Sequence, residues 1–256
     1  MCLIAIAYRA HPAYPLIIAA NRDEFYDRPT APLNFWPDHP GILAGRDLKN
    51  RGTWLGVNTQ GKVAAVTNYR EPDAKPDTGI SRGRLVSDFL AGDTPAETYL
   101  ETIKGQKDAY SGFNLIAGTT DRLLWYSNRG GVITMIEPGI HAVSNHLLDT
   151  PWPKAEKIRQ GMTAVVGAPG EIDPEDIFSL LADTTPPPDE QLPDTGIGPD
   201  WERTLSPVFI TSSIYGTRCS SVIRVDTAGN ILFCERTFDP SKNSETRCFE
   251  IQAAPI

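Results

Sequence analysis

The sequence predicts an α+β fold in which two mostly antiparallel sheets lie face to face between outer layers of helices. Strands and helices follow each other in blocks along the chain: strands, two helices, strands, two helices, strands. This order favours antiparallel sheets with helices packed outside them over alternating strand–helix–strand units. A chain of 256 residues can bury roughly 70–75% of its unfolded surface. We therefore expect a single domain over residues 1–256.

The first 24 residues predict a hairpin whose second strand carries a polar cluster. Residues 2–8 (CLIAIAY) form a wholly apolar run, which is typical of a strand buried on both faces. The segment 11–15 (HPAYP) has turn chemistry, and the apolar run 16–20 (LIIAA) follows it. Asn21 to Glu24 would then lie at the end of the second strand. A buried first strand fixes the end of the chain, and with it Cys2.

The middle and the end of the chain predict further hairpins and two pairs of helices. A second hairpin covers residues 53–68 and ends in Asn-Tyr-Arg at 68–70. Residues 25–50 contain prolines and aromatics, which predicts an irregular loop that lines a pocket, and the proline-rich segment 183–199 predicts an exposed loop. The remaining expected elements are helices over 82–91, 96–104, 153–162 and 174–181, and strands over 113–119, 123–127, 132–136, 140–144, 209–215, 219–226 and 231–235.

The charge of the chain argues against nucleic acid and anionic membranes as partners. The formal net charge is -8 and the isoelectric point is near 5.0, and the sequence has no basic run. Its apolar runs are too short to span a bilayer, and the N-terminus lacks the basic start and cleavage site of a signal peptide. We therefore expect a cytoplasmic protein without a transmembrane segment. The sequence leaves the oligomeric state open.

The cysteines and histidines show no metal-binding pattern. The four cysteines lack CxxC pairing, and three of them lie on or near strand-like segments. We therefore expect neither a zinc site nor a disulfide, and we interpret Cys219, Cys234 and Cys248 as reduced thiols of the core. The four histidines share no metal-ligand spacing, so no metal site is predicted.

Cys2 is the candidate nucleophile of the chain. Cys is small enough for an aminopeptidase to remove Met1, which would give Cys2 a free α-amine beside its thiol. The unperturbed pKa values, about 7.7–8.0 for the amine and about 8.5 for the thiol, let the amine accept the thiol proton near neutral pH. Side chains at the ends of neighbouring strands can converge on one point. The polar residues expected near Cys2 are Asp23 and three asparagines that each close a predicted strand: Asn21, Asn68 and Asn145.

A set of short motifs runs in order through nearly the whole chain. They are Asn-Arg-Asp-Glu at 21–24 after an initial Met-Cys, Gly-Arg-Asp at 45–47, Gly-Thr-Trp at 52–54, Thr-Asn-Tyr-Arg at 67–70, Ser-Asn at 144–145 and Tyr-Gly-Thr-Arg at 215–218. With these motifs the chain resembles the NRDE family, also called the transport and Golgi organization family. That family is similar to the N-terminal-nucleophile amidohydrolases, which include penicillin V acylase and bile salt hydrolase. The resemblance implies a four-layer αββα sandwich with Cys2 as the nucleophile.

The chemistry of such a site assigns a role to each catalytic candidate. The sulfur of Cys2 would attack a carbonyl, its α-amine would carry the proton, and Asp23 would orient the amine. Asn68 and Asn145 would donate hydrogen bonds to the oxyanion. Arg218 would lower the pKa of the thiol or bind an acidic group of the substrate.

The candidate substrate-binding residues come from the same motifs. The acylases place an arginine directly before the first asparagine, where this chain has Ala20, and we expect Arg22 to point to the opposite face of the strand. Arg218 would then replace the missing cation in part. The residues predicted to bind the substrate are Asn21, Arg22, Arg28, Trp54 and Tyr69.

Three functions are compatible with these residues. The first is a cytosolic N-terminal cysteine amidohydrolase or acyltransferase that acts on a non-peptide amide of a small molecule and needs no cofactor. The second, implied by the resemblance, is a haem or lipid binding and trafficking protein in which Cys2 or a histidine such as His146 ligates iron. The third is a stable fold with a degenerate site. In the structural alternatives, Cys2 is a core thiol, the asparagines are turn formers, and an ion network joins Arg22, Glu24, Arg28 and Arg46.

Overall fold

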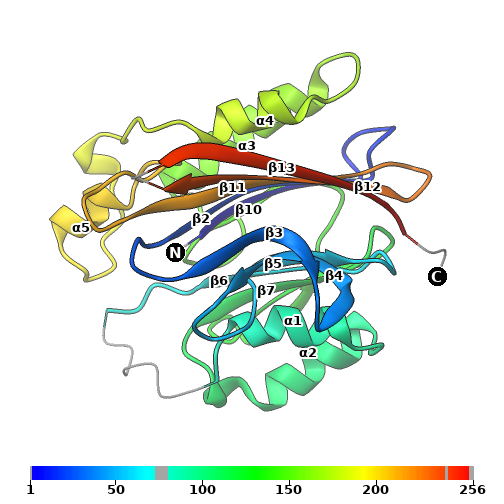
Figure 1. Ribbon diagram of the computed structural model, residues 1–256. Coiled ribbons are helices and arrows are strands. Elements are labelled where there is room, and N and C mark those ends of the chain that lie inside the picture. The colour runs from blue at the N-terminus through cyan, green and yellow to red at the C-terminus, as the bar shows by residue number, and fades with distance from the viewer. Residues whose placement is uncertain (1, 73–79, 240–241, 254–256) are drawn as a thin grey trace.

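Two stacked sheets between two layers of helices make up the protein (Figure 1). The computed structural model describes residues 2–72, 80–239 and 242–253. Within these ranges every pair of neighbouring strands is antiparallel. Helices cover the outer face of each sheet, and the inner faces pack against each other. The predicted α+β sandwich with its αββα layers is confirmed.

The six-stranded sheet contains the N-terminal strand and the polar motif of residues 21–24. Its outer face is covered by α3 (Pro153–Gly167) and α4 (Pro174–Leu181), and the short helix α5 (Pro199–Thr204) follows after a 3-10 turn, η2 (Asp189–Gln191). In spatial order its strands are β10 (Gly139–Val143), β1 (Cys2–Tyr8), β2 (Leu16–Phe25), β11 (Tyr215–Val225), β12 (Asn230–Asp239) and β13 (Lys242–Gln252).

The seven-stranded sheet is a meander, because its spatial order follows its order in the chain. Its outer face is covered by α1 (Gly83–Ala91) and α2 (Ala96–Gly105), with a 3-10 turn, η1 (Lys107–Ala109), after α2. Its strands are β3 (Thr30–Trp36), β4 (His39–Asp47), β5 (Leu55–Asn58), β6 (Val63–Asn68), β7 (Phe113–Gly118), β8 (Leu123–Ser127) and β9 (Ile133–Met135).

The apolar strand β1 is buried on both faces, as its sequence predicts. Because successive side chains of a strand point to opposite faces, Ile4 and Ile6 pack into the core between the sheets. Leu3 and Ala5 pack against the helices of the outer layer. Cys2 is in phase with Ile4 and therefore faces the space between the two sheets.

Two predictions about loops and strands are wrong. Residues 25–50 are not an irregular loop, since most of them form the hairpin β3–β4, whose register shifts twice. Proline is compatible with this hairpin because Pro32 stands at a shift in register of the edge strand β3 and Pro40 stands outside the paired residues of β4, so neither removes a ladder hydrogen bond. Residues 209–215 are not a strand either. They make only an isolated bridge, between Thr211 and Gly216, before β11 begins at Tyr215.

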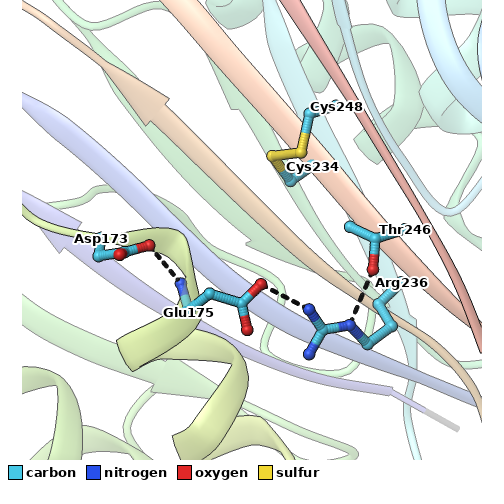
Figure 2. Close-up of a disulfide and its surroundings, with 6 residues drawn as sticks. All are labelled: Asp173, Glu175, Cys234, Arg236, Thr246 and Cys248. Carbon is cyan, nitrogen blue, oxygen red and sulfur yellow. Dashed lines mark hydrogen bonds and ion pairs between the residues drawn. A yellow bond between two sulfur atoms is a disulfide. The ribbon is translucent and has the colours of Figure 1, made fainter.

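The hairpin β12–β13 overturns the prediction that the last cysteines are reduced. Cys234 and Cys248 pair directly across the two strands and form a disulfide, with their Cα atoms 4.1 Å apart (Figure 2). The sequence prediction ends the last strand at residue 235, so Cys248 had no predicted partner. Arg236 joins three elements beside the disulfide, because it donates to Thr246 on β13 and to Glu175 on α4 (Figure 2). Cys219 remains a buried free thiol, as predicted.

Within the described residues, no helix combines the length and the apolar character required to cross a membrane.

Candidate functional site

A cavity of about 790 Å³ opens between the two sheets at the start of β1. Its walls come from β1, β2, β11 and β12 of the six-stranded sheet, from β3, β4 and β6 of the seven-stranded sheet, from the start of α1, and from α5. Three of the predicted site residues do not line it: Asn21, Asn145 and Arg218. The cavity is lined by the other seven, namely Cys2, Arg22, Asp23, Arg28, Trp54, Asn68 and Tyr69.

Cys2 lies at the head of β1 on the wall of the cavity, with 7% of its surface exposed. Burial raises the pKa of the Cys2 thiol. The charge of Arg22 and a hydrogen bond from the backbone N–H of Asp23 act in the opposite direction, but they do not outweigh burial. The hydroxyl of Ser144 fixes the backbone of the residue by donating to the Cys2 carbonyl at 3.1 Å.

Asp23 lies two residues before the end of β2 and is 2% exposed. Its Oδ1 accepts a hydrogen bond of 2.7 Å from Thr217, its partner residue on β11. The Thr217 hydroxyl is itself oriented, because it accepts from the backbone N–H of Ile210. Burial raises the pKa of Asp23, and the positive charges of Lys154 and Arg22 act against this rise.

Asn68 and Asn145 form a carboxamide pair at the end of β6. The Nδ2 group of Asn145 donates to Oδ1 of Asn68 at 2.9 Å and to its backbone oxygen at 3.2 Å. The Ser144 hydroxyl lies 3.1 Å from Oδ1 of Asn145 and completes the chain of contacts back to β1. Asn145 is fully buried, while Asn68 lines the cavity. The pair therefore leaves Nδ2 of Asn68 as the carboxamide donor that can reach a ligand.

Arg22 corrects the prediction about the face on which its side chain lies. Arg22 and Ala20 are two residues apart on β2, so both point between the sheets, and Arg22 pairs in register with Cys2. The expectation that Arg22 points to the opposite face is wrong. The arginine of the acylases corresponds to position 20, directly before Asn21, whereas Arg22 comes directly after Asn21. The two positions are two residues apart and therefore lie on the same face of the strand. Arg22 also lies opposite Cys219 on β11, so two free thiols flank it on the same face.

Arg218 does not supply the cation of the cavity. Its Nη1 group donates to the backbone oxygens of Phe25, Tyr26 and Arg28 at 2.8–3.2 Å. The register of β11 shifts between Thr217 and Cys219, at Arg218, as in a β-bulge. Arg218 therefore holds the turn after β2 and does not line the cavity beside the thiol, where it was predicted to lie.

The side chain of Asn21 also forms hydrogen bonds within the fold and does not line the cavity. Its Nδ2 group donates to the carbonyls of Leu181 and Val208 at 2.8 and 2.9 Å, and its Oδ1 accepts from Ser220 at 2.6 Å. These bonds lie on the outer face of the sheet, under α4 and the segment before β11. Asn21 is therefore not among the residues that line the cavity, and its predicted contact with a substrate has no support from its position.

The charged residues at the mouth of the cavity are linked, as the structural alternative proposed. Glu24 lies 3.7 Å from Arg22 and 3.6 Å from Arg28, and Arg28 pairs with Asp47 at 2.6 Å. Arg46 is not part of this network, because it pairs with Asp38. Burial is the largest single effect on Asp47 and raises its pKa, but the bond and the charge of Arg28, together with the backbone N–H bonds from Lys49 and Asn50, outweigh it and the net pKa is lowered.

Trp54 and Tyr69 line the cavity from the side of the second sheet. Trp54 is almost fully buried, and Tyr69 packs its ring 4.9 Å from that of His146. His146 is not among the lining residues, and its Nδ1 contacts Thr150. No group of three or more metal-binding side chains occurs in the described ranges.

Two charged residues at or behind the cavity were not predicted from the sequence, Glu235 and Lys154. Glu235 on β12 lines the cavity and accepts a 2.7 Å bond from the backbone N–H of Leu33. It lies close to Gly45, where a Cβ atom would be 3.1 Å from the Glu235 carboxylate, so a side chain at Gly45 would require Glu235 to shift. A signal existed, because Glu235 is in phase with the buried Phe233 on the same strand. Lys154 is buried behind the cavity, and its signal was its place in the apolar stripe of the predicted helix 153–162.

The sequence over residues 1–240 matches the model of one protein family, described as Transport and Golgi organisation 2. The chain belongs to this family. It is 36% identical to the Transport and Golgi organization protein 2 homolog of Homo sapiens and 35% identical to the Transport and Golgi organization 2 homolog of Mus musculus, covering 98% of both chains in each case. It is 29% identical to Transport and Golgi organization protein 2 of Drosophila melanogaster, covering 93% of this chain and 92% of that protein. The family resemblance stated from the motifs is confirmed.

Solved structures of N-terminal-nucleophile hydrolases share the fold of this member of the Transport and Golgi organisation 2 family. An arginine-to-leucine variant of the conjugated bile acid hydrolase from Clostridium perfringens aligns with a TM-score of 0.51 at 10% identity, over 100% of this chain and 98% of that one. The Caenorhabditis elegans orthologue of N-acylethanolamine-hydrolyzing acid amidase aligns with a TM-score of 0.50 at 9% identity, over 87% and 92%. At such identities the likeness concerns the fold alone.

Proposed function

We propose that the chain is an N-terminal cysteine amidohydrolase or acyltransferase that acts on a non-peptide C–N bond of a small molecule. The observation that carries this proposal is the position of Cys2, the first described residue of β1, on the wall of a cavity that Asp23 and Asn68 also line. The likeness in fold to two amide-cleaving enzymes supports it.

The reaction starts from a chain that has lost Met1. The α-amine of Cys2 takes the thiol proton, and the sulfur attacks the carbonyl carbon of the amide. The oxyanion accepts a hydrogen bond from Nδ2 of Asn68, which Asn145 holds in orientation. The C–N bond then breaks, the leaving amine takes the proton from the α-ammonium, and a thioester remains on Cys2. Water or an acceptor amine attacks the thioester, which releases the acid or the transferred acyl group.

Asp23 and Arg22 would support this chemistry from β2. The carboxylate of Asp23, held by Thr217, would stabilise the α-ammonium that forms when the thiol ionises. Arg22, directly opposite Cys2, would favour the thiolate and offset part of the cost of burying it.

Intact mass and thiol labelling test the nucleophile directly. We expect purified protein to lack one methionine and iodoacetamide to label Cys2 before Cys219. Both residues are buried free cysteines, and the pKa of the Cys219 thiol is raised well above its usual value, chiefly by burial, so Cys219 serves as the internal control. Homogeneous soluble protein that retains Met1 would end the proposal, because Cys2 would then have no free amine.

A panel of small N-acyl amides tests the reaction. We expect release of a primary amine from at least one of them, together with an acyl adduct on Cys2 in the mass spectrum. Cys2→Ala should abolish both signals, and Cys219→Ala should keep them. Amine release that persists in Cys2→Ala would contradict the assignment of the nucleophile.

A second candidate is a protein that binds haem or a lipid in the same cavity without catalysis. The observation in its favour is the cavity itself, whose volume of about 790 Å³ is large enough for a small molecule to bind without reacting. The raised pKa of the buried Cys2 thiol disfavours the thiolate, and this counts against Cys2 both as a nucleophile and as an iron ligand. His146 is a poor iron ligand because it does not line the cavity. A haem titration of the wild type and of Cys2→Ala tests this candidate: a Soret shift that Cys2→Ala removes would favour it, and an unchanged spectrum would exclude haem.

A further inference from the structure

A buried lysine lies behind the candidate site. Lys154 is the second residue of α3, which packs against β1 and β10, and only 3% of its surface is exposed. Its Nζ donates to the backbone oxygen of Leu205 at 3.0 Å. A buried ammonium is costly unless nearby charges and acceptors compensate it.

The backbone contacts place this ammonium on the side of the sheet where Asp23 is anchored. The segment from Leu205 to Val208 is bonded at one end to Lys154 and at the other end to Asn21, whose Nδ2 donates to Val208. Asn21 lies two residues before Asp23 on β2, so both side chains start from the same face of the strand. Lys154 and Asp23 thus lie on the same side of the sheet, beneath the covering segment from Leu205 to Val208, where their charges act on each other.

The charges around Lys154 are complementary. The groups that act on it electrostatically are Asp23 on β2, Cys2 on β1, Glu202 on α5 and Arg70 after β6. Arg70 and Glu202 form a buried ion pair of 2.5 Å, and the Arg70 guanidinium also lies over the ring of Trp152. Because that pair is largely neutral as a unit, Asp23 is the carboxylate left to balance Lys154.

We propose that Lys154 is a positioning residue that keeps the buried Asp23 in its carboxylate form, so that Asp23 can stabilise the ammonium of Cys2. This role deepens the proposed function and rests on it. Without a cation behind it, a carboxyl group as buried as Asp23 would favour its neutral form. The reciprocal effect supports the pairing: Lys154 lowers the pKa of Asp23 and Asp23 raises that of Lys154, each against the effect of burial.

Carbon-13 NMR of protein labelled at the aspartate carboxyl carbons tests the inference without reference to activity. The Asp23 signal is assigned by its loss in Asp23→Asn. We expect Lys154→Gln, which keeps an amide donor for Leu205 but no charge, to raise the titration midpoint of Asp23 by about one pH unit or more. Lys154→Met should do the same, and Lys154→Arg should stay close to the wild type. Lys157→Met is the control. Lys157 follows Lys154 by three residues on α3 and its side chain is exposed, so its replacement should leave the titration midpoint of Asp23 unchanged.

The pH profile of Cys2 alkylation then tests whether the charge of Lys154, acting through Asp23, affects the reactivity of the Cys2 thiol. We expect Lys154→Gln to slow alkylation at neutral pH about tenfold, and to have no further effect in the Asp23→Asn background. An Asp23 midpoint that does not move, or an equal slowing in both backgrounds, would overturn the inference. If Met1 is retained, the alkylation result fails together with the proposed function, whereas the carboxyl titration still decides the role of Lys154.

Discussion

Cys2 and Arg22 lie directly opposite each other on neighbouring strands, and both side chains face the cavity between the two sheets. The same arginine lies opposite Cys219 on its other side. A single cation therefore stands between two buried thiols. The charge of Arg22 lowers the pKa of both thiols, although burial raises each of them by more. This arrangement makes Arg22 the residue on which the reactivity of Cys2 should depend.

Replacing Arg22 with methionine should slow the alkylation of Cys2. Without the guanidinium, one of the effects that lower the pKa of the thiol is lost, so this pKa should rise further and less thiolate should be present at neutral pH. We expect the iodoacetamide rate at pH 7 to fall about tenfold, and the midpoint of its pH profile to move upward. Arg84→Met, on an exposed face of α1, is the matched control. Equal profiles for the two variants would show that Arg22 does not act on the thiol.

The Asn68–Asn145 pair predicts two different losses of activity. Asn68→Ala removes the proposed oxyanion donor and should lower kcat by about 10²–10³-fold. Asn145→Ala leaves the Asn68 donor in place but removes the hydrogen bond that orients it. The loss in kcat should therefore be smaller, about ten- to a hundredfold. Asn230→Ala, at the exposed first residue of β12, should have no effect. A larger loss for Asn145→Ala than for Asn68→Ala, measured on the best amide of the panel, would reverse the two assignments.

The sequence could predict the elements and residues that depend on local pattern. The apolar run of β1 and the turns that follow it placed Cys2 and Asp23 at one end of a hairpin, and that placement is observed. The strand β13 escaped prediction because its sequence, KNSETRCFEIQ, is largely polar and suits an exposed edge.

Other features of the site depend on contacts that are distant in the sequence. The direction of the Arg218 side chain depends on a shift in register on β11, which the residue pattern of the sequence does not indicate. Lys154 and Asp23 are brought together only when α3 covers the sheet, because the two residues are far apart in the chain. Asn21 and Asp23 differ in role although both belong to one motif, because Asn21 meets the carbonyls of the covering segment and Asp23 reaches the rim of the cavity.

The disulfide predicts a reductant-sensitive stability. Cys234 and Cys248 are 14 residues apart, and closing a loop of that length stabilises a folded chain by about 3 kcal/mol in the chain-entropy account. We expect a reductant to lower the free energy of unfolding by about 2–3 kcal/mol, measured by urea denaturation. A Cys234→Ser and Cys248→Ser double variant should start at the lower value and should not respond to reductant. A response that persists in the double variant would place the sensitive group elsewhere.

The buried Lys154 predicts a pH dependence of stability on the alkaline side. Burial lowers the pKa of Lys154 from 10.5 to about 8, while Asp23 acts in the opposite direction. Between about pH 8 and pH 10.5 the unfolded chain therefore binds more protons at this position than the folded chain, so stability should rise with pH. The full difference is on the order of 3 kcal/mol.

The comparison of the wild type with Lys154→Met isolates this contribution. Urea denaturation at several values between pH 7 and pH 10.5 gives the free energy of unfolding of both proteins, and the wild type should gain on the variant as the pH rises. Groups with raised pKa values, such as Cys2 and Tyr215, titrate in both proteins and should largely cancel in the difference. A difference that stays constant over this range would mean that burial does not lower the pKa of Lys154. A rise that already has its full slope of about 1.4 kcal/mol per pH unit at pH 7 would mean that the lysine is neutral in the folded protein, and the charge assigned to it beside Asp23 would have to be withdrawn.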